Sequence, residues 1–146
     1  MSLSLKNIKG DIGTAYICLS PLKNLFNDEA LYNNAAYHAE QATEKCIKYV
    51  LSNYYGIEET ARRFKTHNIP DLLAFLRECA EESGRDIPID IPDLIDELSV
   101  EIMEWEANSR YNDDMVILRK NIKMVLQADE KMYKQLQKMN TNPKIQ

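Results

Sequence analysis

Apolar residues recur every three or four positions along most of the chain, a spacing typical of amphipathic α-helices. The clearest stretch runs from about Asp28 to Tyr54, where alanines and larger apolar residues share one face and Gly56 follows the end. A second long stretch, from about Asn112 to Met139, keeps an alternating three- and four-residue spacing that Asp129 interrupts. We expect a long helix over each stretch.

Three further segments show the same periodicity. The first runs from about Leu5 to Phe26, and we expect it to break near Ser20, because Pro21 removes a helical hydrogen-bond donor. A short helix is expected to begin near Thr66 to Asp71, and a fourth to cover Ile91 to Trp105 and end before Arg110.

These five segments predict an all-α fold, an antiparallel up-and-down bundle of four to five helices. The 146 residues fit a single domain over residues 1–146, in which residues 140–146 form a disordered tail. Only four glycines and five prolines are present, which argues against a turn-rich β architecture.

The cysteine pattern and the hydropathy indicate the cellular compartment of the protein. Cys18, Cys46 and Cys79 are too widely spaced for a zinc site and too few for a secreted disulfide framework, so Cys46 and Cys79 are expected to be small buried residues. The longest uncharged stretch, Ile12 to Leu22, is about half the length that spans a bilayer. With no basic leader before an apolar segment, we expect a cytoplasmic protein without membrane contact.

Charge is unevenly distributed, although the net charge is only −5. Residues 81–106 are strongly acidic, and residues 107–146 are basic. The acidic residues of the fourth helix are expected to pair with the basic last helix, or alternatively to dock a basic partner. These residues are Asp93, Glu97, Glu101 and Glu104.

One polar strip on the second helix could carry chemistry. At 100° per residue, His38, Lys45 and Tyr49 project close together, with Gln41 nearby, beside the alanine-rich face. These side chains could hold a phosphate or a base at a groove edge, or they could simply bond neighbouring helices. The sequence contains no E-x-x-H, H-E-x-x-H or Gly-rich phosphate loop, so we expect no metal and no cofactor.

Three short motifs, in order, resemble the HEPN family. The stretch from Ala35 to Lys48 resembles its long-helix signature, Thr66-His67 its threonine-histidine helix start, and Ser109-Arg110-Tyr111 its arginine-tyrosine turn. The resemblance covers about residues 8–138. It implies a helical bundle, commonly dimeric, that works beside a small nucleotidyltransferase and is either a ribonuclease or a non-catalytic binding module.

The resemblance also bears on catalysis. Family ribonucleases carry an arginine followed, after four to six residues, by a histidine near the start of the last long helix. At those distances after Arg110 this chain has only apolar residues, which implies that nuclease activity is absent. The spacing does occur between Arg62 and His67, ahead of the short third helix, where His67 is expected to orient the helix start instead.

The leading hypothesis is a non-catalytic HEPN-like module that forms a homodimer and binds a nucleotide, RNA or a small nucleotidyltransferase. One alternative is a toxin-like HEPN ribonuclease of a toxin–antitoxin pair, using Arg62 and His67. Another is a structural bundle without a ligand. The predicted binding residues form a cationic cluster with no carboxylate of its own and are His38, Lys45, Arg110, Tyr111, Tyr49 and Gln41.

Overall fold

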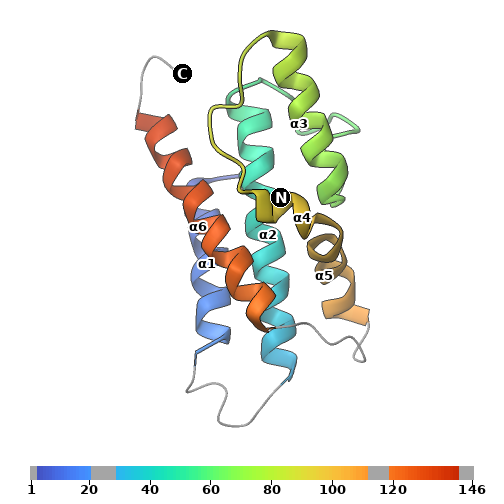
Figure 1. Ribbon diagram of the computed structural model, residues 1–146, viewed down its shortest axis with the longest axis vertical. Helices are drawn as coiled ribbons and strands as arrows, with labels where there is room; N and C mark the ends of the chain where they lie inside the picture. Colours follow the sequence, from blue (N-terminus) through green and yellow to red (C-terminus); the bar gives the residue numbers. More distant parts are fainter. Residues whose placement is uncertain (1–2, 21–28, 112–118, 142–146) are drawn as a thin grey trace.

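The computed structural model describes residues 3–20, 29–111 and 119–141, and it leaves out the side chains of residues 29–31, 107–111 and 141. All regular secondary structure in these ranges is α-helical, as the sequence predicts (Figure 1). The helices are α1 (Leu5–Cys18), α2 (Glu29–Asn53), α3 (Ile69–Ser83), α4 (Asp93–Glu97), α5 (Ser99–Tyr111) and α6 (Arg119–Thr141).

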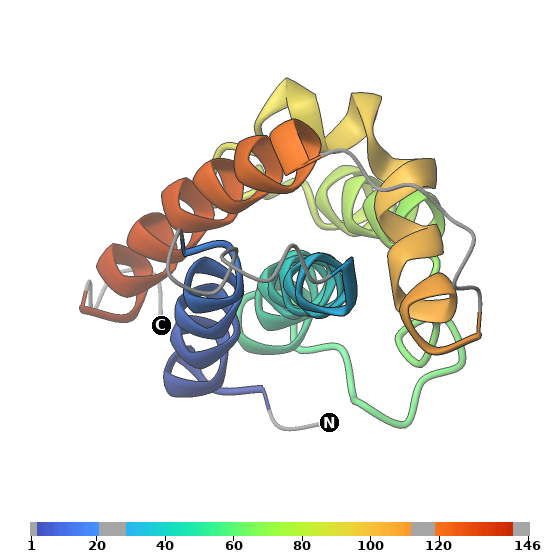
Figure 2. The same cartoon turned by 90° about the horizontal axis from the view of Figure 1, so that it is seen from below.

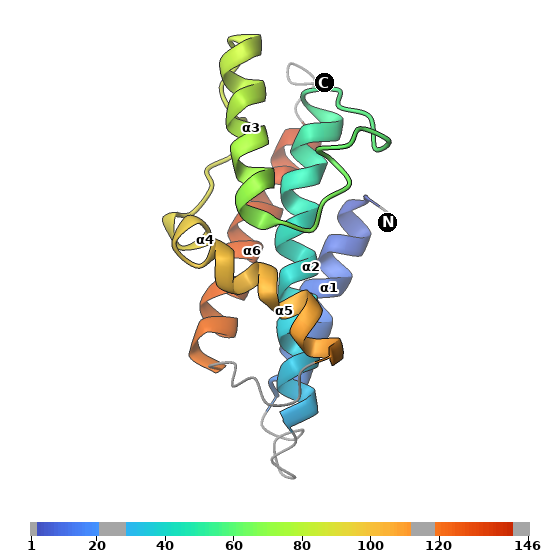
Figure 3. The same cartoon turned by 90° about the vertical axis from the view of Figure 1, so that its right-hand side faces the viewer.

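The helix α2 forms the centre of the bundle. In the view along its axis, α1 lies on one side of α2 and α5 on the other, while α6 crosses α1 and α2 (Figure 2). The four helices α1, α2, α5 and α6 alternate in direction along the chain, as in an up-and-down bundle (Figures 1 and 3). The helix α3 packs on the C-terminal part of α2, and the short α4 leads into α5 (Figure 3).

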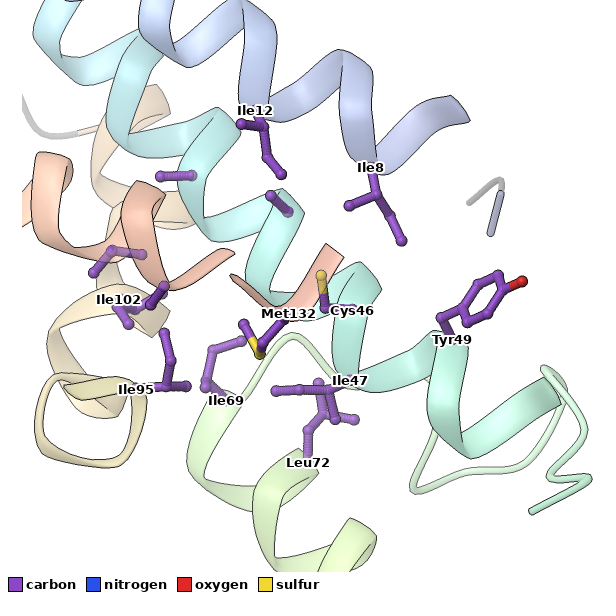
Figure 4. Close-up of a cluster of buried hydrophobic side chains, with 14 of the residues drawn as sticks. Ile8, Ile12, Cys46, Ile47, Tyr49, Ile69, Leu72, Ile95, Ile102 and Met132 are labelled. Atoms are coloured by element: carbon purple, nitrogen blue, oxygen red, sulfur yellow. The ribbon is translucent and has the colours of Figure 1, made fainter. Parts of the chain in front are cut away.

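The core consists of apolar side chains that every helix contributes. In Figure 4, Ile8 and Ile12 of α1 face α2, and Ile69 and Leu72 of α3 approach Ile47. The largest fully buried side chain is Trp105 of α5. Cys46 and Cys79 are buried free thiols, which confirms the expectation for both.

Local sequence signals set the bounds of the helices α1 and α3. The predicted break near Ser20 is confirmed, because α1 ends at Cys18. At the start of α3, the Asn68 side chain accepts a hydrogen bond from the backbone nitrogen of Asp71 at 3.0 Å. Gly84 ends α3 with φ of 68°, a left-handed conformation that glycine adopts without steric strain.

The expectation of one continuous helix from Ile91 to Trp105 is wrong. The structure has two helices there, α4 and α5, that meet at Leu98. The reason is packing: α4 lies against α6 while α5 lies against α2, so the chain must change direction to bury both apolar stripes. The predicted end before Arg110 is also wrong, because α5 continues to Tyr111.

The apolar faces of α2 and α6 are used inside the domain. The α2 alanines and the apolar positions of α6 are buried against neighbouring helices of the same chain. Glu101 accepts hydrogen bonds from the amide of Asn121 on α6 at 3.0 and 3.1 Å, rather than pairing with a lysine. The helix α6 also includes Asn140, which the sequence placed in a tail, and residues 142–146 lie outside the description.

Candidate functional site

The polar strip on α2 meets a carboxylate that the sequence analysis did not anticipate. Asp11 of α1 lies between the two cationic candidates, with Oδ1 2.9 Å from Nδ1 of His38 and Oδ2 2.6 Å from Nζ of Lys45. The prediction of a cationic cluster without its own carboxylate is therefore wrong. The Asp11 carboxylate neutralises Lys45 and ties α1 to α2.

The other candidates on α2 point elsewhere. The Tyr49 hydroxyl donates to Oδ1 of Asn140 on α6 at 2.7 Å, and burial raises the pKa of this phenol. The Gln41 amide donates to Oε2 of Glu40 at 2.7 Å. These two side chains do not converge with His38 on one ligand position.

Arg110 and Tyr111 form the last residues of α5, and their side chains lie outside the described part of the chain. The helix α5 packs on the side of α2 opposite to α1 (Figure 2). The Asp11 contact places His38 and Lys45 toward α1. The structure therefore does not bring the two halves of the predicted groove together through their helices.

A different polar cluster lies where the segment before α3 crosses α2. Nδ1 of His67 is 2.7 Å from Oε1 of Glu44, and Nζ of Lys48 is 3.3 Å from the other oxygen, Oε2. The His67 side chain is 55% exposed, whereas Glu44 is fully buried. A carboxylate only accepts hydrogen bonds, so Nδ1 of His67 carries a hydrogen in this contact. The arrangement anchors the imidazole at one nitrogen and leaves Nε2 available.

Glu40 completes this cluster one helical turn earlier on α2. Its side chain is fully buried, and burial together with the neighbouring Glu44 raises the pKa of Glu40 to about 10. Glu40 is therefore a neutral carboxylic acid at physiological pH, next to Glu44. We call Glu40, Glu44, Lys48 and His67 the acid–histidine cluster.

A pocket of about 380 Å³ opens beside the acid–histidine cluster. Its cationic lining comes from Lys48, Lys65 and His67, and its apolar lining from Leu3 and Phe64. Nζ of Lys48 lies 5.2 Å from the centre of the Phe64 ring, which together with Glu44 fixes the lysine in place. Glu59 is the remaining lining residue. Because Lys48 is already paired with Glu44, Lys65 and the imidazole of His67 are the lining groups that can meet an anionic group such as phosphate.

Arg62, the other alternative candidate, lines a separate pocket together with Arg63, Thr66 and Asp71. It is not among the lining residues of the pocket that contains His67. Arg63 pairs with Glu78 of α3 and lies over the Phe75 ring. The structure thus places the Arg62 and His67 candidates on two neighbouring surfaces of the same segment.

The sequence analysis missed Glu40, Glu44 and Lys48, although a signal for them was present. The three residues are spaced four apart on α2, so they form a charged stripe along one face of the helix. Their burial follows from the chain segment around His67 and from α5, which cover that face. This charged stripe beside the alanine face was the sequence signal for a buried polar cluster.

A second buried carboxyl group lies on the other side of the core. Asp129 of α6 is fully buried, its Oδ1 is 2.6 Å from the Thr43 hydroxyl oxygen, and burial raises its pKa well above the usual value. In the described part of the chain, no group of three or more His, Cys, Asp or Glu side chains is arranged to hold a metal ion. None of the helices described combines the length and the apolarity needed to cross a membrane.

The described part of the chain is an all-helical bundle centred on α2. A family model, described as the HEPN domain, matches residues 12–139. The chain therefore belongs to the HEPN family, as its three sequence motifs suggested. Neither the search of curated proteins nor the search of solved structures gave a match.

Proposed function

We propose that this HEPN domain binds a phosphate-bearing ligand, a nucleotide or an RNA, in the pocket beside His67, and that it does not cleave this ligand. The observation that carries the proposal is the His67 imidazole, which the buried Glu44 anchors through Nδ1. The ring lines the pocket together with Lys48 and Lys65. An imidazole held at one nitrogen presents the other nitrogen to a ligand in a defined direction.

The size and lining of the pocket support a nucleotide or one unit of an RNA chain. A volume of about 380 Å³ lies within the range of small-molecule sites. Leu3 and Phe64 provide apolar surface for a base, while Lys65 and His67 provide charge for a phosphate. Because these charges lie at a partly exposed site, salt should weaken the binding.

The separation of Arg62 from His67 supports binding without cleavage. General base catalysis by His67 would need a second group that stabilises the charge developing on the same phosphate. Arg62 lines the neighbouring pocket, and the arginine before the last helix, Arg110, has no histidine at the spacing of family ribonucleases. We therefore expect purified protein to leave RNA intact.

The test is ligand-dependent thermal stability of the full chain. We expect AMP, ATP or a short RNA to raise the melting temperature, since a ligand at a hundred times its Kd stabilises a protein by about 2.7 kcal/mol. His67→Ala and Lys65→Ala should remove the gain. Lys120→Ala, which removes an exposed lysine at the start of α6, should keep it.

Two outcomes would contradict this assignment. No rise in melting temperature with any of the three ligands would reject the proposed function. A rise that survives His67→Ala but disappears in Lys45→Ala/Arg110→Ala would move the ligand to the α2 polar strip, the first site that the sequence indicated.

Ribonuclease activity remains the second candidate, and the hydrogen bond between Glu44 and His67 favours it. A carboxylate that orients an imidazole is a recurring arrangement for a general base. RNA cleavage by the wild-type protein that is lost in His67→Ala and in Arg62→Ala would establish this candidate and replace the binding module. A matched variant, Arg77→Ala on α3, should not affect such cleavage.

We further propose a cytoplasmic homodimer that works beside a small nucleotidyltransferase. The support is family resemblance and the free cysteines, of which Cys46 and Cys79 are buried thiols. Light scattering at micromolar concentration should give twice the chain mass of 16.9 kDa. A mass of one chain would reject the homodimer, and a native pull-down without a nucleotidyltransferase would reject the partner.

A further inference from the structure

One oxygen of each carboxyl group in the acid–histidine cluster lacks a hydrogen-bond donor among the residues that the structure describes. Oε1 of Glu40 and Oε2 of Glu44 are buried, and neither accepts a hydrogen bond from an N–H or O–H group among the described residues. Lys48 approaches Oε2 of Glu44 only at 3.3 Å, an ion-pair distance without good hydrogen-bond geometry. Buried oxygens without donors are costly, so the cluster requires an additional hydrogen.

A hydrogen on Glu40 meets this requirement. The two carboxyl groups belong to residues four apart on α2, and the contact with Glu44 is one of the causes that raise the pKa of Glu40. The charged groups that face Glu40 come from two elements, Glu44 on α2 and Glu106 on α5, and both are acidic. Gln41 occupies the remaining oxygen of Glu40 as a donor. His67 and Lys48 face Glu44, whereas the charged groups that face Glu40 are acidic, so the hydrogen belongs on Glu40 and Glu44 accepts it.

We infer that Glu40 is a positioning residue for His67 and acts through Glu44: it donates a hydrogen bond that holds Glu44 in the orientation that accepts from Nδ1 of His67. Glu40 itself does not line the pocket. Its effect is to fix the imidazole in the tautomer with hydrogen on Nδ1, so that Nε2 is left for the phosphate ligand. The identity of the ligand in this inference rests on the proposed function, whereas the arrangement of Glu40, Glu44 and His67 does not.

The tautomer can be read directly by nitrogen NMR of the imidazole rings in the full-length protein. The chain has only two histidines, and His38 makes the same type of contact, Nδ1 to a carboxylate oxygen of Asp11. His38 is therefore an internal reference in every spectrum. The spectra should be taken above the pH at which both rings lose their charge, and His38→Gln assigns the signals.

Glu40→Leu removes the donor and Glu40→Gln keeps one, because an amide N–H can still donate to Glu44. In Glu40→Leu we expect His67 to move toward the tautomer mixture of a free imidazole, His38 to stay unchanged, and the affinity for inorganic phosphate to fall about tenfold. Glu40→Gln should retain the wild-type tautomer and most of the affinity. Asp129→Asn, which alters a buried carboxyl elsewhere in the core, should change neither the His67 tautomer nor the phosphate affinity.

The inference is overturned if folded Glu40→Leu keeps the His67 tautomer, or if Asp129→Asn shifts it equally. If Glu40→Leu does not fold, a shift of the His67 tautomer in Glu40→Gln overturns the inference as well, and an unchanged tautomer supports it. If the wild type binds no phosphate while the tautomer still responds to Glu40→Leu, the proposed function fails and the positioning role stands.

Discussion

Asp129→Asn should make the protein progressively more stable than the wild type as the pH rises. The Thr43 hydroxyl donates to Oδ1 of Asp129 at 2.6 Å, and the carbonyl oxygen of Ala39 lies 3.0 Å from the same hydroxyl. The other oxygen, Oδ2, is buried without a hydrogen-bond partner among the described residues, so it can carry the hydrogen of a protonated Asp129. The raised pKa of Asp129, caused by burial and opposed only in part by Thr43, indicates this protonated form.

The sign and the size of this difference in stability follow from proton linkage. The folded state keeps a proton that the unfolded state releases above about pH 4, so stability falls as the pH rises through this window. One retained proton corresponds to about 1.4 kcal/mol per pH unit. Asparagine holds no such proton, and its Oδ1 can accept from Thr43 at every pH. While Asp129 keeps its proton in the fold, we therefore expect the variant to gain up to about 1.4 kcal/mol relative to the wild type for each unit of pH.

Urea unfolding followed by circular dichroism at pH 5, 6 and 7 gives this difference directly. Glu40 adds its own pH dependence, but it does so equally in both proteins and cancels from the comparison. A difference that stays constant with pH would show that Asp129 binds no extra proton in the fold. A difference of the opposite sign would show that Asp129 is charged there, and either result refutes the reasoning.

Five substitutions test the fold itself by urea unfolding. Leu72→Ala should cost about 2–5 kcal/mol by opening a cavity at a fully buried position, whereas exposed Val100→Ala should cost less than about 0.5 kcal/mol; equal costs would contradict the core. Asn68→Ala should cost about 1 kcal/mol through loss of the α3 cap, and no loss would show that the cap bond is dispensable. Gly84→Ala should destabilise by about 1 kcal/mol at φ of 68°, while Gly13→Ala, mid-helix with open space for a methyl group, should stabilise by about 0.5–1 kcal/mol. The same sign for both glycines would contradict the assigned backbone.

Periodicity along the chain predicted most helices because burial imposes it directly on the sequence. It could not locate the break at Leu98, since the apolar stripe continues through it and only the positions of α2 and α6 require the turn. The periodicity showed Asp129 only as an interruption of the apolar stripe along the last helix. Its contact with Thr43 explains this polar residue, and the two residues lie 86 positions apart in the sequence.

The candidate site was harder to predict than the fold for the same physical reason. His67 was identified, but as a helix-start residue, because its partner Glu44 lies on another element 23 positions away. His38 and Lys45 were correctly placed together on α2, yet their charge balance depends on Asp11 of a different helix. Angles within one helix cannot reveal which acid a neighbouring helix supplies.

The central position of α2 restricts which substitutions the domain tolerates. Because α1, α3, α5 and α6 all pack on it, enlarging any of the four buried alanines would push a neighbouring helix outward. The outer face of α1 is the opposite case, since Gly10, Gly13 and Ile17 are exposed to solvent. A fluorescent label or an affinity handle attached to that face would report on the domain without disturbing its packing or the pocket beside His67.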